Sequence, residues 1–147
     1  MYLDSCILVK LLAVEPDSDY FERSLRGQPL TSSELAYAEV LSALLARERT
    51  GKISAADRRR AWRQFLDWVE TGEVRLEPLN FLVLRKSTQV LEHCHPQAPL
   101  RTMDAIHLAT VEFSQDFPLA TTDARLRDAA SLLGFELFPG APSFPAN

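Results

Sequence analysis

Four acidic residues stand where the neighbouring sequence is otherwise apolar: Asp4, Glu39, Asp104 and Asp123. Asp4 precedes the run Ile7-Leu8-Val9, and Asp123 follows the apolar segment Pro118-Leu119-Ala120. A carboxylate buried in apolar surroundings is costly unless another group compensates its charge. Four such costs are large for a domain whose whole stability is on the order of 5–15 kcal/mol. A divalent metal ion shared by the four carboxylates is the simplest single compensation.

Carboxylates gathered without a cation would be forced to keep some protons. Mg²⁺ or Mn²⁺ suits a site made only of oxygen ligands, and such an ion is commonly held by one or two direct carboxylates plus water. A metal of this kind can generate a nucleophilic hydroxide and stabilise charge on a phosphodiester. The residue types therefore predict a metal centre that acts on phosphate esters.

Each acid also has a structural alternative. Asp4 and Asp123 follow predicted strands and precede predicted helices, so either could be an N-cap. Glu39 and Asp104 lie within predicted helices, away from the ends, where a buried salt bridge or a narrow polar stripe is the alternative. His107 lies one turn after Asp104 on the same helix face. For His107, a core histidine hydrogen-bonded to backbone is favoured over a general base or a metal ligand.

Short strand patterns alternate with helical patterns along the chain. Helical periodicity, capping residues and glycine stops predict helices over residues 5–14, 17–26, 32–50, 54–71, 80–93, 102–114 and 123–133. Ser32 or Ser33 is the expected cap of the third helix, and Thr102 that of the sixth. Strands are expected over residues 1–4, 29–31, 73–77, 118–121 and 135–137. This alternation predicts an α/β fold, a three-layer α/β/α sandwich with a short-stranded parallel sheet. The acids Asp4 and Asp123 would then share the crevice at the carboxyl ends of the strands.

The composition is that of an ordinary globular domain, because 46% of the residues are hydrophobic and 24% are charged. Two cysteines do not make a disulfide framework. The N-terminal segment lacks a basic region typical of a signal peptide, and no apolar stretch approaches the ~20 residues that a transmembrane helix needs. We therefore expect a cytoplasmic protein with no membrane association.

Basic residues concentrate in one stretch although the formal net charge is −4. Seven of the 16 Lys and Arg residues lie in it: Arg47, Arg49, Lys52, Arg58, Arg59, Arg60 and Arg63. The functional interpretation is a rim that contacts phosphates beside the acidic centre. A solvated helical surface explains the same residues, and composition alone favours that simpler interpretation.

Four segments in series resemble the motifs of the PIN-domain family, specifically the VapC-like toxins of toxin–antitoxin pairs. They are Tyr2-Leu3-Asp4-Ser5, the helix containing Ala38-Glu39-Val40, the segment 100–109 around Asp104, and Leu119-Ala120-Thr121-Thr122-Asp123 with its continuation to Gly134. The resemblance spans almost the whole chain in the family's order. Cys6 departs from it mildly, since a serine or another small residue is usual there.

The resemblance implies a metal-dependent endoribonuclease that hydrolyses structured RNA such as tRNA or rRNA. It implies Asp4, Glu39, Asp104 and Asp123 as the catalytic acids, with Mg²⁺ or Mn²⁺ held by Asp4, Asp104 and Asp123. It further implies a homodimer and a small VapB-like antitoxin that covers the site. We expect residues 1–138 to form the PIN-like nuclease domain and residues 139–147 a Pro-rich C-terminal tail.

Two other functions fit parts of the sequence. A non-catalytic PIN-like module that binds RNA or protein would share the fold, but the retained acids argue against it. A haloacid dehalogenase-like phosphatase built on Asp4 would need a second aspartate two positions later, where Cys6 stands instead. The ribonuclease therefore remains the leading hypothesis.

Overall fold

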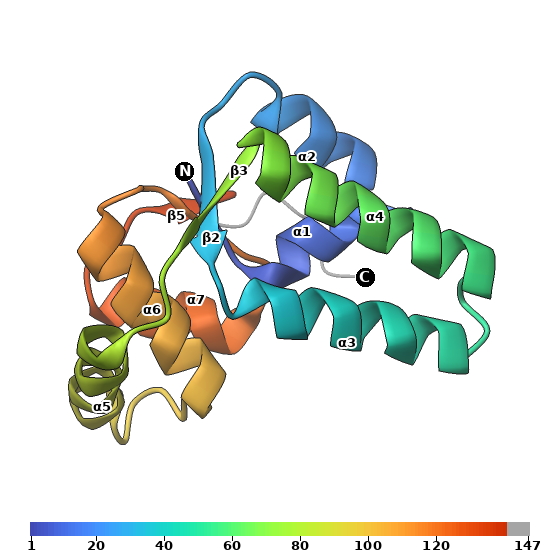
Figure 1. Ribbon diagram of the computed structural model, residues 1–147. Coiled ribbons are helices and arrows are strands. Elements are labelled where there is room, and N and C mark those ends of the chain that lie inside the picture. The colour runs from blue at the N-terminus through green and yellow to red at the C-terminus, as the bar shows by residue number, and fades with distance from the viewer. Residues whose placement is uncertain (141–147) are drawn as a thin grey trace.

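Five short parallel strands form one sheet in the order β3-β2-β1-β4-β5 (Figure 1). The structure is a computed structural model that describes residues 1–140. The strands are β1 (Tyr2–Leu3), β2 (Leu30–Ser33), β3 (Val74–Glu77), β4 (Leu119–Ala120) and β5 (Leu137–Phe138). The central strand β1 pairs with β2 through Tyr2 and Thr31 and with β4 through Tyr2 and Leu119. Parallel pairing places the carboxyl ends of β1, β2 and β4 at one edge of the sheet.

Helices cover both faces of the sheet, which confirms the three-layer α/β/α prediction (Figure 1). The first face carries α1 (Ser5–Leu12), α2 (Ser18–Leu25), α3 (Ala36–Arg49) and α4 (Ala55–Thr71). The second face carries α5 (Phe81–Cys94), α6 (Thr102–Ser114) and α7 (Ala124–Leu132). Every described helix connects successive parallel strands or follows one of them, as a crossover topology requires.

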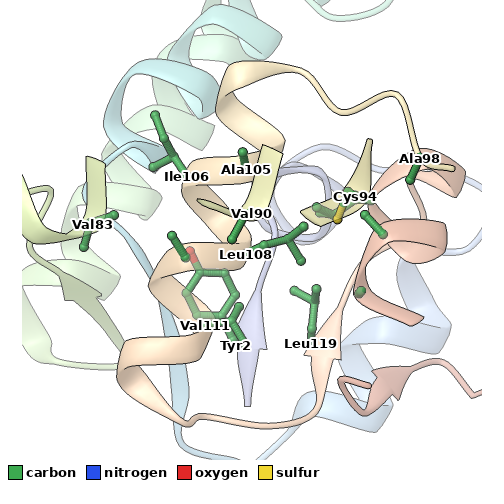
Figure 2. Packing of buried hydrophobic residues seen from close by; sticks show 14 residues of the cluster. Tyr2, Val83, Val90, Cys94, Ala98, Ala105, Ile106, Leu108, Val111 and Leu119 are labelled. Atoms are coloured by element: carbon green, nitrogen blue, oxygen red, sulfur yellow. The ribbon is translucent and has the colours of Figure 1, made fainter. Parts of the chain in front are cut away.

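The pleat of the strands divides the core into two clusters. Side chains alternate between faces along a strand, so Tyr2 and Leu119 face α5–α7 whereas Leu3 and Ala120 face α1–α4. All four side chains have no solvent exposure. Figure 2 shows Tyr2 and Leu119 packed with Leu108 of α6. Because both faces are covered, the two-residue strands β1 and β4 are apolar throughout.

The predicted start of the third helix is wrong. Ser32 and Ser33 were expected to cap it, yet both lie in β2, and α3 begins at Ala36. Pairing of β2 with β3 extends as far as Ser33 and Glu77. The Ser32 hydroxyl donates to the Leu3 carbonyl at 2.8 Å. Serine bonds readily to nearby backbone in caps and in strand ends alike, so its type alone did not distinguish the two structures.

The C-terminal boundary remains a prediction. β5 ends at Phe138, and the Arg127 guanidinium donates to the carbonyls of Pro139 at 2.8 Å and Gly140 at 3.3 Å. The rest of the expected Pro-rich tail, residues 141–147, lies outside the described residues. In the described part of the chain, no helix is both long enough and apolar enough to cross a membrane.

Candidate functional site

The four predicted acids line one cavity of about 650 Å³ at the carboxyl ends of the strands. Asp4 follows β1 and Asp123 lies three residues beyond β4, while Glu39 and Asp104 enter from α3 and α6. His107, Cys6 and the cations Lys10, Arg47 and Arg101 also line the cavity. The location agrees with the general rule that ligands of parallel sheets bind beyond the carboxyl ends of the strands. Residues far apart in sequence thus meet where the topology predicted.

All four acids lie at the N-terminus or in the first turn of a helix. Asp4 and Asp123 are the N-cap residues of α1 and α7, while Glu39 and Asp104 lie in the first turns of α3 and α6. The expectation that Glu39 and Asp104 stand away from helix ends is therefore wrong. α3 begins later than predicted, at Ala36, and α6 begins at Thr102, close to the predicted start. Negative charge at a helix N-terminus is stabilised by roughly 0.3–1 kcal/mol through the helix dipole. Four helix ends therefore favour anionic side chains in this cavity.

The burial of the acids is less uniform than the apolar sequence context implied. Asp4 is buried, with 8% of its surface exposed, whereas Glu39 and Asp104 are half-buried and Asp123 is exposed. The inference from burial cost therefore holds fully for Asp4 only. The other three acids are accessible from the cavity, as ligands of an ion or of water must be.

The Asp4 carboxylate is held by Thr121 and not by a helix cap. Its Oδ2 accepts a hydrogen bond from the Thr121 hydroxyl at 2.8 Å, and it makes no side-chain bond to the α1 backbone. The same hydroxyl oxygen accepts the backbone N–H of Asp123 at 3.1 Å. Thr121 therefore connects the acids that follow β1 and β4.

Asp123 and Asp104 each bind backbone N–H groups. Asp123 Oδ1 accepts from Arg125 at 2.9 Å and Leu126 at 3.1 Å, which confirms its capping role. Asp104 Oδ2 accepts the Arg101 N–H at 2.9 Å and lies 3.7 Å from the Arg125 guanidinium. The N-cap of α6 is thus Arg101, and Thr102, the expected cap, is the first helical residue. In both carboxylates, the second oxygen accepts no hydrogen bond from residues 1–140.

Glu39 is bound to His107 and Ser5. Its Oε2 lies 2.7 Å from His107 Nε2 and 2.5 Å from the Ser5 hydroxyl. Burial works against the charge on Glu39, but the bonds to His107 and Ser5 outweigh it and lower the pKa of this carboxyl. Burial likewise opposes the imidazolium of His107, yet the carboxylates of Glu39 and Asp4 raise its pKa. Glu39 and His107 therefore stabilise each other as a charged pair.

The surroundings of His107 differ from those expected. The ring is buried, but among the described residues its nitrogens have side-chain partners and no backbone hydrogen bond: Nδ1 lies 2.8 Å from the Tyr2 hydroxyl, and Nε2 lies 3.9 Å from Asp4 Oδ1. Burial raises the pKa of Tyr2 well above its ordinary value, so its phenol keeps the proton. The three-residue spacing from Asp104 indicated only that His107 and Asp104 share one helix face, and it did not indicate the contacts with Tyr2 and Glu39.

Cys6 lies in the cavity as a protonated thiol. Burial, followed by the nearby Asp4, raises the pKa of Cys6 to about 12. Its Sγ lies 3.6 Å from the hydroxyls of Thr121 and Thr122. A thiol that keeps its proton is a poor nucleophile and a poor metal ligand, so Cys6 fills space beside Asp4.

Part of the basic stretch is neutralised within the protein. Among the seven basic residues, Arg47 pairs with Glu15, Arg58 with Glu48 and Arg60 with Asp57. In the cavity itself, Lys10 binds Glu15 at 2.8 Å and Asp17 at 2.9 Å. Arg101, in contrast, has no ion pair with any described residue. It is thus the lining cation whose charge is left for a ligand.

The donor set of the cavity fits a hydrated hard cation. No three His, Cys, Asp or Glu side chains of the described residues lie close enough together to hold one ion directly. Mg²⁺ commonly keeps several waters and takes only one or two carboxylates. The carboxylates of Asp4, Asp104 and Asp123 offer oxygen donors, which such an ion prefers over nitrogen and sulfur. A metal bound partly through water is therefore compatible with this spacing.

Comparison with known proteins gives matches over nearly the whole chain. The family model for the PIN domain matches residues 1–132. The chain is 39% identical to Ribonuclease VapC46 of Mycobacterium tuberculosis, covering 97% of this chain and 98% of that protein. It is 32% identical to Ribonuclease VapC45 of the same species, covering 95% and 94%. Among solved structures, FitAcB from Neisseria gonorrhoeae superposes with a TM-score of 0.67, covering 93% of this chain and 95% of that one, at 15% identity, and supports the fold alone.

Proposed function

This chain belongs to the PIN-domain family and is a ribonuclease of the VapC toxin type, and on that premise we propose that it hydrolyses RNA in the cavity lined by Asp4, Glu39, Asp104 and Asp123 with the help of a divalent metal ion. The observation that carries the proposal is the convergence of these four acids, from four helix N-termini, in one cavity. Three of the four are accessible there, and Asp4 is fixed by Thr121. Family membership and the donor chemistry support the same centre independently.

Asp4, Asp104 and Asp123 would hold Mg²⁺ or Mn²⁺. When bound, the ion supplies positive charge that activates water and stabilises the charge developing on the phosphodiester. The protein contributes orientation: Thr121 fixes Asp4, and backbone N–H groups fix one oxygen each of Asp104 and Asp123. The second oxygens of Asp104 and Asp123 accept no hydrogen bond from the described residues, and Asp4 Oδ1 lies 3.9 Å from His107 Nε2.

Glu39 acts on water in this proposal. Both of its hydrogen bonds fall on Oε2, from the Ser5 hydroxyl and from His107. Oε1 accepts no hydrogen bond from the described residues, and Glu39 is one of the residues that line the cavity. A carboxylate held in this way can accept a proton from, or orient, a water that attacks phosphorus. Its lowered pKa keeps it ionised at neutral pH.

The substrate class is structured RNA, such as tRNA or rRNA, and the site of action is the cytoplasm. The uncompensated Arg101 at the cavity wall supports a polyanionic substrate, since a net-negative cavity needs a cation to receive a phosphate. A small VapB-like antitoxin is the proposed partner that covers the cavity. Both assignments rest on the family and on the charge of the cavity.

The proposed assembly is a homodimer through an apolar patch where α5 begins and α6 ends. The patch comprises Phe81, Leu82 and Phe113, which are 72%, 59% and 54% exposed. Leu82 and Phe113 line the same small hollow beside β3. Large apolar side chains gathered on one surface are typical of an interface.

The decisive experiment is RNA cleavage with controlled metal. Purified protein is incubated with cellular RNA and Mn²⁺, with EDTA as control, and new 5′ ends are sequenced. Discrete cleavage that EDTA and Asp4→Asn or Asp104→Asn abolish, in folded protein, is expected. Co-expression with the antitoxin should relieve growth arrest. Full activity of either variant would contradict the assignment, and RNA binding without cleavage would favour the non-catalytic module.

A further inference from the structure

We infer that His107 is a positioning residue for the reaction, which fixes the Glu39 carboxylate through a buried chain of hydrogen bonds that begins at Tyr2. The inference rests on the proposed role of Glu39 and extends it to residues outside the acidic set. Its basis is the linear order Tyr2 hydroxyl, His107 Nδ1, His107 Nε2, Glu39 Oε2, with distances of 2.8 Å and 2.7 Å. The Ser5 hydroxyl completes the chain at Glu39.

The direction of the hydrogen bond to Glu39 is set by chemistry. A carboxylate only accepts hydrogen bonds, so Nε2 must carry the proton that lies between the two residues. Nδ1 then faces the Tyr2 hydroxyl, which can donate to it or accept from it. Tyr2 therefore favours the ring orientation in which Nε2–H faces Glu39, as a second partner commonly does for a functional histidine.

The burial of this chain of bonds makes it rigid. Tyr2 lies on the central strand β1 with no exposed surface, and His107 is 2% exposed. Their rings contact edge to face, with centroids 5.9 Å apart. Among the described residues, no buried side-chain nitrogen or oxygen lacks a hydrogen-bond partner. The imidazole is thus anchored in the core, whereas the carboxylate that it holds reaches into the cavity.

His107 also stands between two of the acids. Its Nε2 lies 3.9 Å from Asp4 Oδ1 while it is bonded to Glu39, and Asp104 lies one turn earlier on the same helix. The ring therefore holds Glu39 by a hydrogen bond and lies within ion-pair distance of Asp4. Removal of the ring would leave Glu39 with the Ser5 bond alone and a choice of side-chain rotamers.

The first test compares rates for His107→Leu and His107→Gln. The probe is cellular RNA, and the rate of the main cleavage is measured under single turnover at increasing enzyme concentrations. His107→Leu should lower the maximal rate by about 10- to 100-fold. This is the range typical for loss of a residue that hydrogen-bonds and orients a metal-binding side chain. The half-saturating concentration should change by less than about threefold, because the ring does not face the RNA. His107→Gln, whose amide can donate to Glu39, should recover most of the rate.

The matched control is His93→Leu, the same change at an exposed histidine of α5. Tyr2→Phe guards against misfolding, since it removes only a hydroxyl and should lower the maximal rate less than His107→Leu. If His107→Leu keeps the wild-type rate while Glu39→Gln loses it, the inference is overturned. If Asp4→Asn and Asp104→Asn are also fully active, the proposed function itself fails.

An NMR measurement tests the bond chain without activity. The chain has three histidines, so the imidazole nitrogens of uniformly labelled protein can be assigned by single substitutions. His107 should show a slowly exchanging Nε2 proton, and its signals should shift in Glu39→Gln and in Tyr2→Phe but not in His93→Leu. Signals of His107 that ignore both Glu39→Gln and Tyr2→Phe would overturn the inference.

Discussion

Replacement of Thr121 by valine should measure what holds Asp4 in place. Thr121 has no exposed surface and Asp4 is 8% exposed, so water does not readily replace the lost hydroxyl. The change keeps the shape of the side chain but removes the donor to Asp4 Oδ2 and the acceptor of the Asp123 N–H. A hydrogen bond to a charged group contributes about 1.5–3 kcal/mol, and a buried group left without a partner costs about 1–3 kcal/mol. We expect unfolding free energy to fall by about 2–3 kcal/mol.

Circular dichroism monitors unfolding by urea, which gives the unfolding free energy, and by heat, which gives the melting temperature. Both measurements are made in EDTA so that bound metal does not contribute. A domain of this size loses about 2–4 °C of Tm per kcal/mol, so the melting temperature should drop by roughly 5–10 °C. Thr122→Val is the matched control, because Thr122 is exposed and, among residues 1–140, its hydroxyl is hydrogen-bonded to the Cys6 sulfur alone. Surface changes of this kind stay within about 0.5 kcal/mol.

A double-mutant cycle isolates the bond itself. In an Asp4→Ala background the carboxylate is absent, so Thr121→Val should cost clearly less than it does in the wild-type chain. A Thr121→Val protein as stable as Thr122→Val would refute the argument. Equal costs in the two backgrounds would show that the bond to Asp4 is not the source of the loss.

Three further outcomes follow from the charges and surfaces described above. Because the pKa of Glu39 is lowered in the folded protein, its contribution to the unfolding free energy is lost as the pH falls through that lowered pKa. Because the pKa of His107 is raised, its contribution is lost as the pH rises through that raised pKa. The contribution of the pair in EDTA should therefore be largest between their ordinary values of 4.5 and 6.5, and this pH dependence should flatten in Glu39→Gln, as read from urea titrations. Cys6, with its pKa raised to about 12, should react slowly with iodoacetamide at pH 8 until the protein is denatured. Mass spectrometry of the labelled peptide measures this reaction, and rapid labelling of the folded protein would contradict the raised pKa. Phe81→Glu should shift the mass by light scattering from dimer to monomer with little change in Tm, and an unchanged mass would place the interface elsewhere.

The sequence carried the fold because its signals were periodic and local. Apolar pairs such as Tyr2-Leu3 and Leu119-Ala120, each bounded by a helix start or a turn, predicted buried parallel strands, and the observed sheet confirms them. Ser32 and Ser33, predicted to begin a helix, lie in β2 because a local pattern does not contain the strand that pairs with them. Their strand pairing depends on β3, more than 40 residues away in the chain, and serine type alone does not reveal it.

The four acids were predictable, but their contacts were not. Residue type and apolar context singled out Asp4 and Glu39, and the topology brought them to one cavity. The reason for their positions was only partly correct, since Asp123 is exposed and Asp104 lies in a first helical turn. The His107 network depends on Tyr2 and Glu39 reaching one ring from positions 105 and 68 residues away, which no local pattern encodes.

The sequence separation of the cavity residues has a consequence for the synthesis of this protein. The cavity needs the start of α1 near the N-terminus and the start of α7 at Asp123, so its walls close only when nearly the whole domain is present. Contacts of such high sequence separation require the closure of long loops, which costs entropy before the contacts can stabilise the fold. A nascent or truncated chain therefore lacks the cavity altogether. A ribonuclease whose cavity is assembled in this way is expected to gain activity only when its synthesis is almost complete.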